Sequence, residues 1–223
     1  MEDPEQDPVK LKSKLIAYTQ HPEMGPEEFI AYCARVSNPG NQYSHETSDR
    51  LLAYLQRNHH WSPFEMASAV IEIETTRDIA RQILRHRSFS FQEFSQRYAD
   101  PTSKESGLGF VTREARLQDT KNRQNSIEMD DERLKAEWQA RQDHLLEIVE
   151  QHYDWASENG IAKEQARAVL PEGLTKSRLY MSGTIRSWMH YCDLRCANGT
   201  QKEHMQVAEA CRQELKTVFP VLF

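Results

Sequence analysis

Apolar residues recur along the chain at two different spacings. A repeat of two is typical of a half-buried strand, and a repeat of about 3.6 is typical of a helix with one apolar side. Alternation predicts a strand over residues 9–19 and a second over residues 67–75. In the second, one face collects four apolar residues: Ala67, Ala69, Ile71 and Ile73.

Helical spacing predicts most of the remaining elements. Pro26 is followed by two glutamates, which suit the first turn of a helix. Thr200 and Glu203 have the spacing of a capping box, which predicts the start of the last helix. The predicted helices are a short one opening at 26–28, then 47–57, 77–86, one ending near Pro171, 185–194, and one from Thr200 towards Pro220.

The longest helical pattern covers residues 130–159. Asn159-Gly160 supplies a left-handed stop at its end. The apolar residues that recur at helical spacing are Leu134, Trp138, Leu145, Ile148, Val149 and Trp155.

Residues 100–128 interrupt this order with a polar, glycine-containing excursion, in which residues 109–112 could form a strand. Strands at both ends of helix-rich stretches favour an α+β fold over a regular series of βαβ units. We therefore expect a central, mostly antiparallel sheet flanked by helices, within a single domain that spans residues 1–223.

Composition narrows the possible functions. The formal net charge of −6 argues against a general nucleic-acid or membrane-surface binder. No apolar run reaches membrane-spanning length, the acidic N-terminus does not resemble a signal peptide, and we expect a cytoplasmic protein. The spacing of the cysteines predicts reduced thiols and no metal site; they are Cys33, Cys192, Cys196 and Cys211.

The segment from Arg85 to Tyr98 carries the densest chemistry, with three arginines, a histidine and a glutamate among phenylalanines. If it is extended, Glu93, Ser95 and Arg97 share one face, which suits a nucleotide base and phosphate. Gln82 lies one helical turn before Arg85 and extends the same surface. The alternative is a basic helix end that satisfies its own carbonyls, with Glu93 paired to an arginine.

This segment resembles the signature of the flavin-dependent thymidylate synthases, an Arg-His-Arg followed by seven residues and a serine, here Arg85 to Arg87 and Ser95. Ser90, Glu93, Arg97 and Tyr98 also fit the family's longer pattern. Further similar segments follow the family's order along the chain: Ala34-Arg35-Val36-Ser37, His60-Trp61-Ser62-Pro63-Phe64-Glu65, Arg167-Ala168-Val169-Leu170-Pro171, Ile185-Arg186-Ser187-Trp188 and Asp193-Leu194-Arg195.

The resemblance implies reductive methylation of dUMP to dTMP by a homotetramer with shared active sites. Methylenetetrahydrofolate would supply the carbon, reduced FAD the hydride, and NADPH would reduce the flavin. It implies that Arg195 is catalytic and that dUMP is bound by Gln82, Arg85, Glu93, Ser95, Gln96, Arg97, Arg167 and Arg195. It implies FAD binding by Ser37, His60, Ser62, Glu65, Arg85, His86, Arg87, Glu93, Thr184, Arg186 and His190.

Each of these residues also has a simpler interpretation. Arg195 could serve its own helix end, and Arg167 could pair with Glu164. Arg186 and His190, four apart, could form a solvated helix face. For the whole chain, the alternatives are a non-catalytic nucleotide- or flavin-binding regulatory protein of the same fold, and an RNA-binding module, which the negative charge disfavours.

Overall fold

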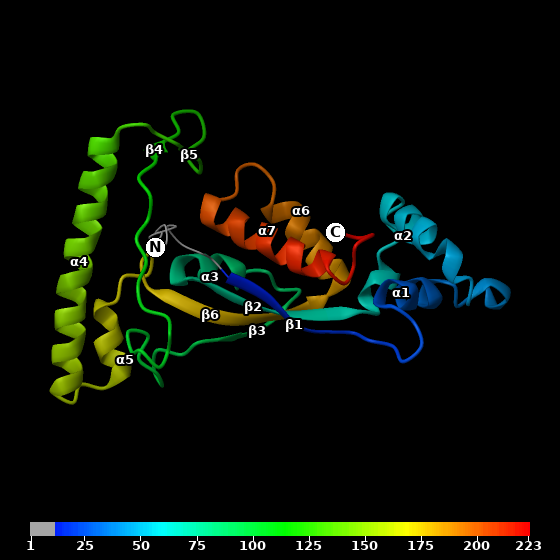
Figure 1. The fold of residues 1–223 in the computed structure, drawn as a ribbon, viewed down its shortest axis with the longest axis horizontal. Coiled ribbons are helices and arrows are strands. Elements are labelled where there is room, and N and C mark those ends of the chain that lie inside the picture. The colour runs from blue at the N-terminus through cyan, green and yellow to red at the C-terminus, as the bar shows by residue number, and fades with distance from the viewer. Residues whose placement is uncertain (1–11) are drawn as a thin grey trace, which may run out of the picture.

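Four strands form the central sheet of the structure, which is a computed structural model that describes residues 12–223. The strands lie in the order β1-β2-β6-β3, and every neighbouring pair is antiparallel. Helices α3 (Arg77–Ile83), α6 (Ile185–Arg195) and α7 (Lys202–Lys216) lie along one face of this sheet (Figure 1). The predicted α+β class is therefore confirmed. The strands are β1 (Lys12–Tyr18), β2 (Ser68–Thr76), β3 (Ser90–Glu93) and β6 (Lys176–Thr184).

The predicted alternation of β2 matches its burial. Ala69, Ile71 and Ile73 are buried, whereas the glutamates between them lie on the other face. The strand predicted over residues 9–19 is observed as β1; residues 9–11 lie outside the described residues.

Strand β6 is central in the sheet, yet the sequence analysis did not predict it. Its inward positions include Ser177 as well as the buried Leu179 and Met181, so the alternation of hydrophobicity is weak. Gly183 is required by a close approach, because a Cβ atom there would lie 2.4 Å from the ring of Phe89. Pairing with β2 and β3, rather than a local pattern, determines this strand.

The helices match most of the predicted segments. Helix α3 ends three residues earlier than predicted, which leaves His86 in the turn that follows it. The segment ending near Pro171 divides into α5 and a short 3-10 turn. The helices are α1 (Pro26–Ala34), α2 (Ser48–Arg57), α3 (Arg77–Ile83), α4 (Glu132–Glu158), α5 (Lys163–Ala166), α6 (Ile185–Arg195) and α7 (Lys202–Lys216), and the 3-10 turns are η1 (Pro39–Asn41), η2 (His45–Thr47), η3 (Ser62–Glu65) and η4 (Arg167–Val169).

The main core lies between the sheet and helices α6 and α7. Helix α6 buries the apolar side that the sequence predicts, including Ile185, Trp188 and Cys192. Helix α7 buries Val207, Ala208, Cys211 and Leu215 on the same core.

The predicted capping box of α7 is wrong. Gln201, not Thr200, precedes the helix, and no side chain caps the backbone there. Glu203 does not reach back to the helix start, because the guanidinium groups of Arg113 and Arg116 hold its carboxylate.

The polar excursion is ordered by contacts with three helices, α3, α4 and α7. Arg113 pairs with Asp78 at 2.8 Å and with Glu203 at 3.0 Å, while Gln142 of α4 hydrogen-bonds both backbone polar groups of Arg113. The strand predicted over residues 109–112 is wrong, because only a single bridge, Phe110 to Thr175, forms there. The excursion instead contains the short hairpin β4 (Leu117–Gln118) and β5 (Ser126–Ile127).

The long helix α4 is confirmed, and it lies beside α5 at one end of the molecule (Figure 1). Asp131 caps its N-terminus by accepting the Leu134 N–H at 3.0 Å, and Gly160 after its end has a φ of 72°. Of its predicted apolar residues only Val149 is buried; Leu134, Trp138, Leu145, Ile148 and Trp155 are each 37–58% exposed. Across residues 12–223, no helix combines the length and apolar character needed to cross a membrane.

Candidate active site

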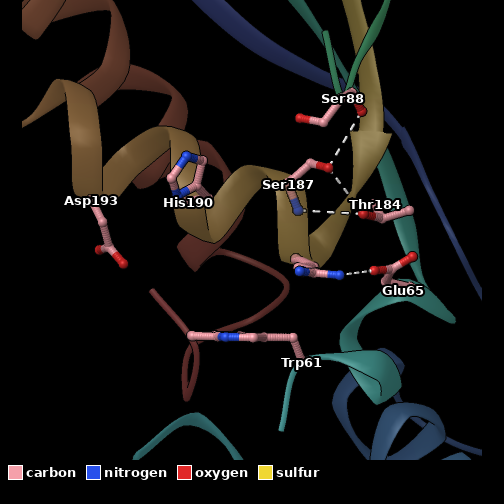
Figure 2. A pocket seen from close by; sticks show the side chains of 8 residues that line it. Trp61, Glu65, Ser88, Thr184, Ser187, His190 and Asp193 are labelled. Atoms are coloured by element: carbon pink, nitrogen blue, oxygen red, sulfur yellow. Dashed lines mark hydrogen bonds and ion pairs between the residues drawn. The ribbon is translucent and has the colours of Figure 1, made fainter. Parts of the chain in front are cut away.

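A cavity of about 580 Å³ opens at the N-terminus of α6 (Figure 2). Helix α6 follows β6 directly, so the strand end fixes where the helix begins. The Thr184 hydroxyl caps the helix by accepting the Ser187 N–H at 3.3 Å. The residues that line the cavity are Trp61, Glu65, Ser88, Thr184, Arg186, Ser187, His190 and Asp193.

The two walls of the cavity are tied together by polar contacts. Arg186 of α6 pairs with Glu65 of η3, and the Ser187 hydroxyl donates to the Ser88 carbonyl at 3.3 Å. Figure 2 shows the indole ring of Trp61 on the opposite side from Ser88. An aromatic ring, a helix N-terminus and several hydroxyls therefore face one space.

Four of the eleven residues predicted to bind flavin line this cavity, namely Glu65, Thr184, Arg186 and His190. Arg85 and Arg87 are exposed, and no carboxylate among residues 12–223 lies within ion-pair distance of either. His60 is exposed on the loop after α2, where its ring packs edge-on against Tyr54. Ser37 and Ser62 are also exposed and do not line the cavity.

Arg195, at the last turn of α6, is held by a histidine rather than by a carboxylate. Its Nε donates to Nε2 of His86 at 2.9 Å. Because that ring nitrogen accepts, the imidazole carries its proton on Nδ1. Burial, and then the charge of Arg195, lowers the pKa of His86 to about 4, so the ring is neutral near pH 7.

This contact anchors Arg195 without neutralising it. Among residues 12–223 no carboxylate pairs with Arg195, and its two Nη nitrogens donate to no side chain or carbonyl. A fixed, uncompensated guanidinium is suited to bind a group on which negative charge develops.

The predicted dUMP residues from Glu93 to Arg97 lie elsewhere. The extended conformation ends at Glu93, and the backbone then turns, with the Tyr98 N–H donating to the Ser95 carbonyl at 3.0 Å. The prediction that Glu93, Ser95 and Arg97 share one face of a strand is therefore wrong, because the turn redirects Arg97 towards Glu164 at 3.2 Å.

The turn after Glu93 lies on the other side of the sheet, whereas the Glu93 side chain itself points to the helical side, towards Arg77 and Ser177. A hollow of about 400 Å³ includes Glu93, Ser95, Arg178 and Tyr180. Arg178 and Tyr180 alternate with the buried Leu179 and so point away from helices α6 and α7. One chain therefore separates Ser95 and Arg97 from Gln82, Arg85 and Arg195 among the predicted dUMP residues.

The simpler, structural interpretations of Glu93 and Arg167 fare differently in the structure. Glu93 does pair with an arginine, but with Arg77 at 3.5 Å, and it also accepts the Ser177 hydroxyl at 2.9 Å. The alternative pairing of Arg167 with Glu164 is not observed among the described residues, since Glu164 pairs with Arg97. Gln96 is only 4% exposed, so its side chain is covered within the chain.

The model of the family described as thymidylate synthase complementing protein matches residues 14–221. The chain belongs to this family. The prediction of family membership from the sequence is confirmed, and with it the prediction that the chain is an enzyme.

Other proteins resemble the chain in sequence and in fold. A probable flavin-dependent thymidylate synthase of Paramecium bursaria Chlorella virus 1 is 47% identical over 94% of the chain and 96% of its own length. The flavin-dependent thymidylate synthase of a Synechocystis strain is 49% identical over 89% of the chain and 88% of its own. Among solved structures, a UMP/dUMP methylase from Streptomyces cacaoi with bound 5-Br dUMP superposes with a TM-score of 0.79, at 26% identity over 95% of the chain and 92% of its own.

Four residues that line the cavity were not among those predicted from the sequence of this family member, namely Trp61, Ser88, Ser187 and Asp193. Each lies within or beside a segment that carried the resemblance. The sequence therefore pointed to the right segments, but only the junction of β6 and α6 shows which of their side chains face the cavity.

Proposed function

We propose that this protein is a flavin-dependent thymidylate synthase that converts dUMP to dTMP. In this reaction methylenetetrahydrofolate provides the carbon, reduced FAD is the hydride donor and NADPH is the reductant. The observation that carries the proposal is Arg195, a guanidinium held by a neutral histidine with both Nη nitrogens available.

The cavity at the start of α6 fits a flavin nucleotide. Trp61 offers an aromatic surface, Arg186 and the exposed Arg85 and Arg87 offer cationic donors for a diphosphate, and His190 adds a ring donor or acceptor. Reduced flavin supplies a hydride when it is bound, which leaves binding and orientation to the protein. The roles of Ser37, His60 and Ser62 remain proposals from the family resemblance.

Arg195 would bind the O2/N3 edge of the pyrimidine and stabilise its ionised form. The hydrogen bond from Nε to His86 fixes the plane of the guanidinium before the substrate binds. A carboxylate in the place of His86 would offset this positive charge, whereas a neutral imidazole leaves it available to the substrate. His86 would therefore orient Arg195 while it also lies near the flavin.

The dUMP site would be completed by a second copy of the chain in a homotetramer. Gln82, Arg85 and Arg195 lie on the helical side of the sheet, whereas Ser95 and Arg97 follow the end of the edge strand β3, beyond Glu93. Arg167, whose side chain has no carboxylate partner among residues 12–223, is also free to meet a phosphate. A shared site explains how residues that one chain separates can contact one nucleotide.

The exposed apolar residues of α4 support this assembly. A stripe formed by Leu134, Trp138, Leu145, Ile148 and Trp155 would stay in contact with water in an isolated chain. We propose that another copy covers this α4 stripe, because the divided dUMP site already requires one.

The direct test measures flavin content and the release of label from C5 of dUMP, with methylenetetrahydrofolate and NADPH present. We expect a yellow protein that can be loaded with FAD and that releases the label. In Arg195→Ala we expect flavin to be retained and kcat to fall by about 10²–10³-fold, since a developing charge loses its donor.

The two alternatives give different results in this test. Protein that cannot be loaded with FAD would contradict the enzyme proposal. Flavin binding without release of label, in the wild type, would favour the non-catalytic regulatory protein. Full activity in Arg195→Ala would remove this residue from the catalytic site but leave the reaction itself established.

A further inference from the structure

A buried histidine of α7, His204, connects two residues of the proposed dUMP site. It is fully buried, and both of its ring nitrogens have partners. Nδ1 lies 3.2 Å from Oε1 of Gln82, and Nε2 lies 3.2 Å from the hydroxyl of Tyr191. Residues 82, 191 and 204 are far apart in the sequence, so this contact exists only in the folded chain.

The contact is one part of a longer chain of hydrogen bonds that ends at Glu203. Gln82 Nε2 donates to Gln201 Oε1 at 2.7 Å, and Gln201 Nε2 donates to Glu203 Oε2 at 2.9 Å. Burial alone would raise the pKa of Glu203, but the guanidinium groups of Arg116 and Arg113 outweigh it and lower this pKa to about 2. Glu203 is therefore a carboxylate and can only accept hydrogen bonds.

The carboxylate fixes the direction of every hydrogen bond in the chain. Gln201 must present its amide nitrogen to Glu203, which leaves its oxygen to accept from Gln82. Gln82 then presents its own oxygen to His204, so Nδ1 of His204 carries the proton. Nε2 accepts from the Tyr191 hydroxyl, and this neutral form agrees with a pKa that burial and the charge of Arg195 lower to about 3.

Two consequences meet at the proposed substrate site. The carboxamide of half-buried Gln82 is left with one free N–H, because His204 and Gln201 occupy its other positions. Tyr191, held by His204, packs edge-on against His86 with ring centroids 4.9 Å apart. His86 in turn holds Arg195.

We propose that His204 is a positioning residue that fixes the amide of Gln82 and the ring of Tyr191, so that the nucleotide meets an N–H from Gln82 beside the guanidinium of Arg195. The ligand group that Gln82 recognises is then an acceptor oxygen, of the kind that phosphates and pyrimidine carbonyls offer. A rotated amide would present its own oxygen there and repel that group. The identity of the nucleotide rests on the proposed function, whereas the orientation of Gln82 does not.

A double-mutant cycle tests whether His204 acts through Gln82. The dissociation constant of dUMP is measured by calorimetry on the flavin-loaded protein. We expect His204→Leu to weaken dUMP binding about 3- to 10-fold, the range of one neutral hydrogen bond, without changing the flavin content. In a Gln82→Leu background the same substitution should have less than about a twofold effect, because its intermediary is absent.

Three further variants separate positioning from general damage. His204→Gln keeps one donor and one acceptor, so it should restore binding to within about twofold of the wild type. Gln206→Leu removes an exposed amide of the same helix and should have no effect. If His204→Leu does not fold, Tyr191→Phe can replace it as the test. It removes only the hydroxyl from which Nε2 accepts a hydrogen bond, and it should also weaken dUMP binding. Equal losses from His204→Leu in both backgrounds, or no rescue by His204→Gln, would overturn the proposal.

A measurement on the wild type keeps this inference separate from the proposed function. The ¹⁵N shifts of the His204 ring should show a proton on Nδ1 and none on Nε2 between about pH 6 and 8. Protonation of Nε2 instead would overturn the orientation of Gln82, even in an active enzyme. Failure of the wild type to bind dUMP, with Nδ1 protonated, would contradict the substrate and leave the orientation established.

Discussion

Helices α4 and α7 both carry apolar residues at helical spacing, but the fold buries those of α7 and exposes most of those of α4. Helix α7 buries Val207, Ala208, Cys211 and Leu215 against the sheet, whereas α4 exposes most of its apolar residues. The same contrast holds for their polar residues. Glu203 of α7 is buried and held by two arginines, whereas Glu137 of α4 pairs with Arg141 at 2.7 Å on the surface.

The difference shows what an apolar stripe can and cannot predict. Periodicity establishes that a helix forms and that one side avoids water. It does not identify the surface that covers this side. For α7 that surface is in the same chain, and for α4 we propose that it belongs to another copy.

The largest expected effect comes from charging the α4 stripe. The double substitution Trp138→Glu and Leu145→Glu should dissociate the proposed tetramer and lower activity by about 100-fold, because the proposed shared sites would come apart. Light scattering and label release from dUMP measure both effects. Ala136→Glu places a single carboxylate on the opposite, exposed side of α4 and should change neither. An intact tetramer in the double variant would assign α4 a different role.

Leucine-to-alanine substitutions compare the two helices in stability. Leu215→Ala removes a fully buried side chain and should lower the free energy of unfolding by about 2–5 kcal/mol. Leu145→Ala removes a side chain that is 45% exposed, and in the dissociated chain it should cost less than about 1 kcal/mol. Denaturant unfolding in the background of the charged α4 variant makes this comparison. Equal costs would mean that α4 packs within its own chain.

The smallest expected effect depends on pH. Burial lowers the pKa of His86 to about 4 and that of His204 to about 3, so the unfolded chain binds more protons below about pH 6.5. From pH 7 to pH 5 each of the two histidines should therefore lower the stability by up to about 2 kcal/mol. Glu27, whose pKa burial raises to about 7, binds its proton more tightly in the folded state and offsets part of this loss. His204→Gln should remove roughly half of the histidine contribution, whereas His144→Gln, at an exposed position of α4, should leave it unchanged. Denaturant unfolding of each variant at pH 7 and at pH 5 measures this pH dependence. If His204→Gln has the same pH dependence as the wild type, the pKa of His204 is not lowered in the folded state.

Much of the fold could be predicted from the sequence where the local preference for helix or strand agrees with the pattern of burial. The alternation in β2, the amphipathic spacing of α2 and α6, and the length of α4 each depend on nearest neighbours along the chain. The predictions were wrong where distant residues outweigh a local signal. Thr200 and Glu203 do not form the predicted capping box, because Arg113 and Arg116 hold the Glu203 carboxylate. Strand β6 forms between β2 and β3 despite its weak alternation of hydrophobicity.

Residue types and their spacing specify the chemical groups of the candidate site. The order and spacing of its arginines, histidines and serines predicted the family and nominated Arg195, Arg186 and His190, since side-chain chemistry does not depend on the fold. The tertiary structure decided which of these groups meet. It brought His86 into hydrogen-bond contact with Arg195, and it placed His204 between Gln82 and Tyr191. It also placed the turn after Glu93 on the far side of the sheet. Hydrogen-bond direction and burial are properties of three-dimensional neighbours, so no spacing along the chain could have specified them.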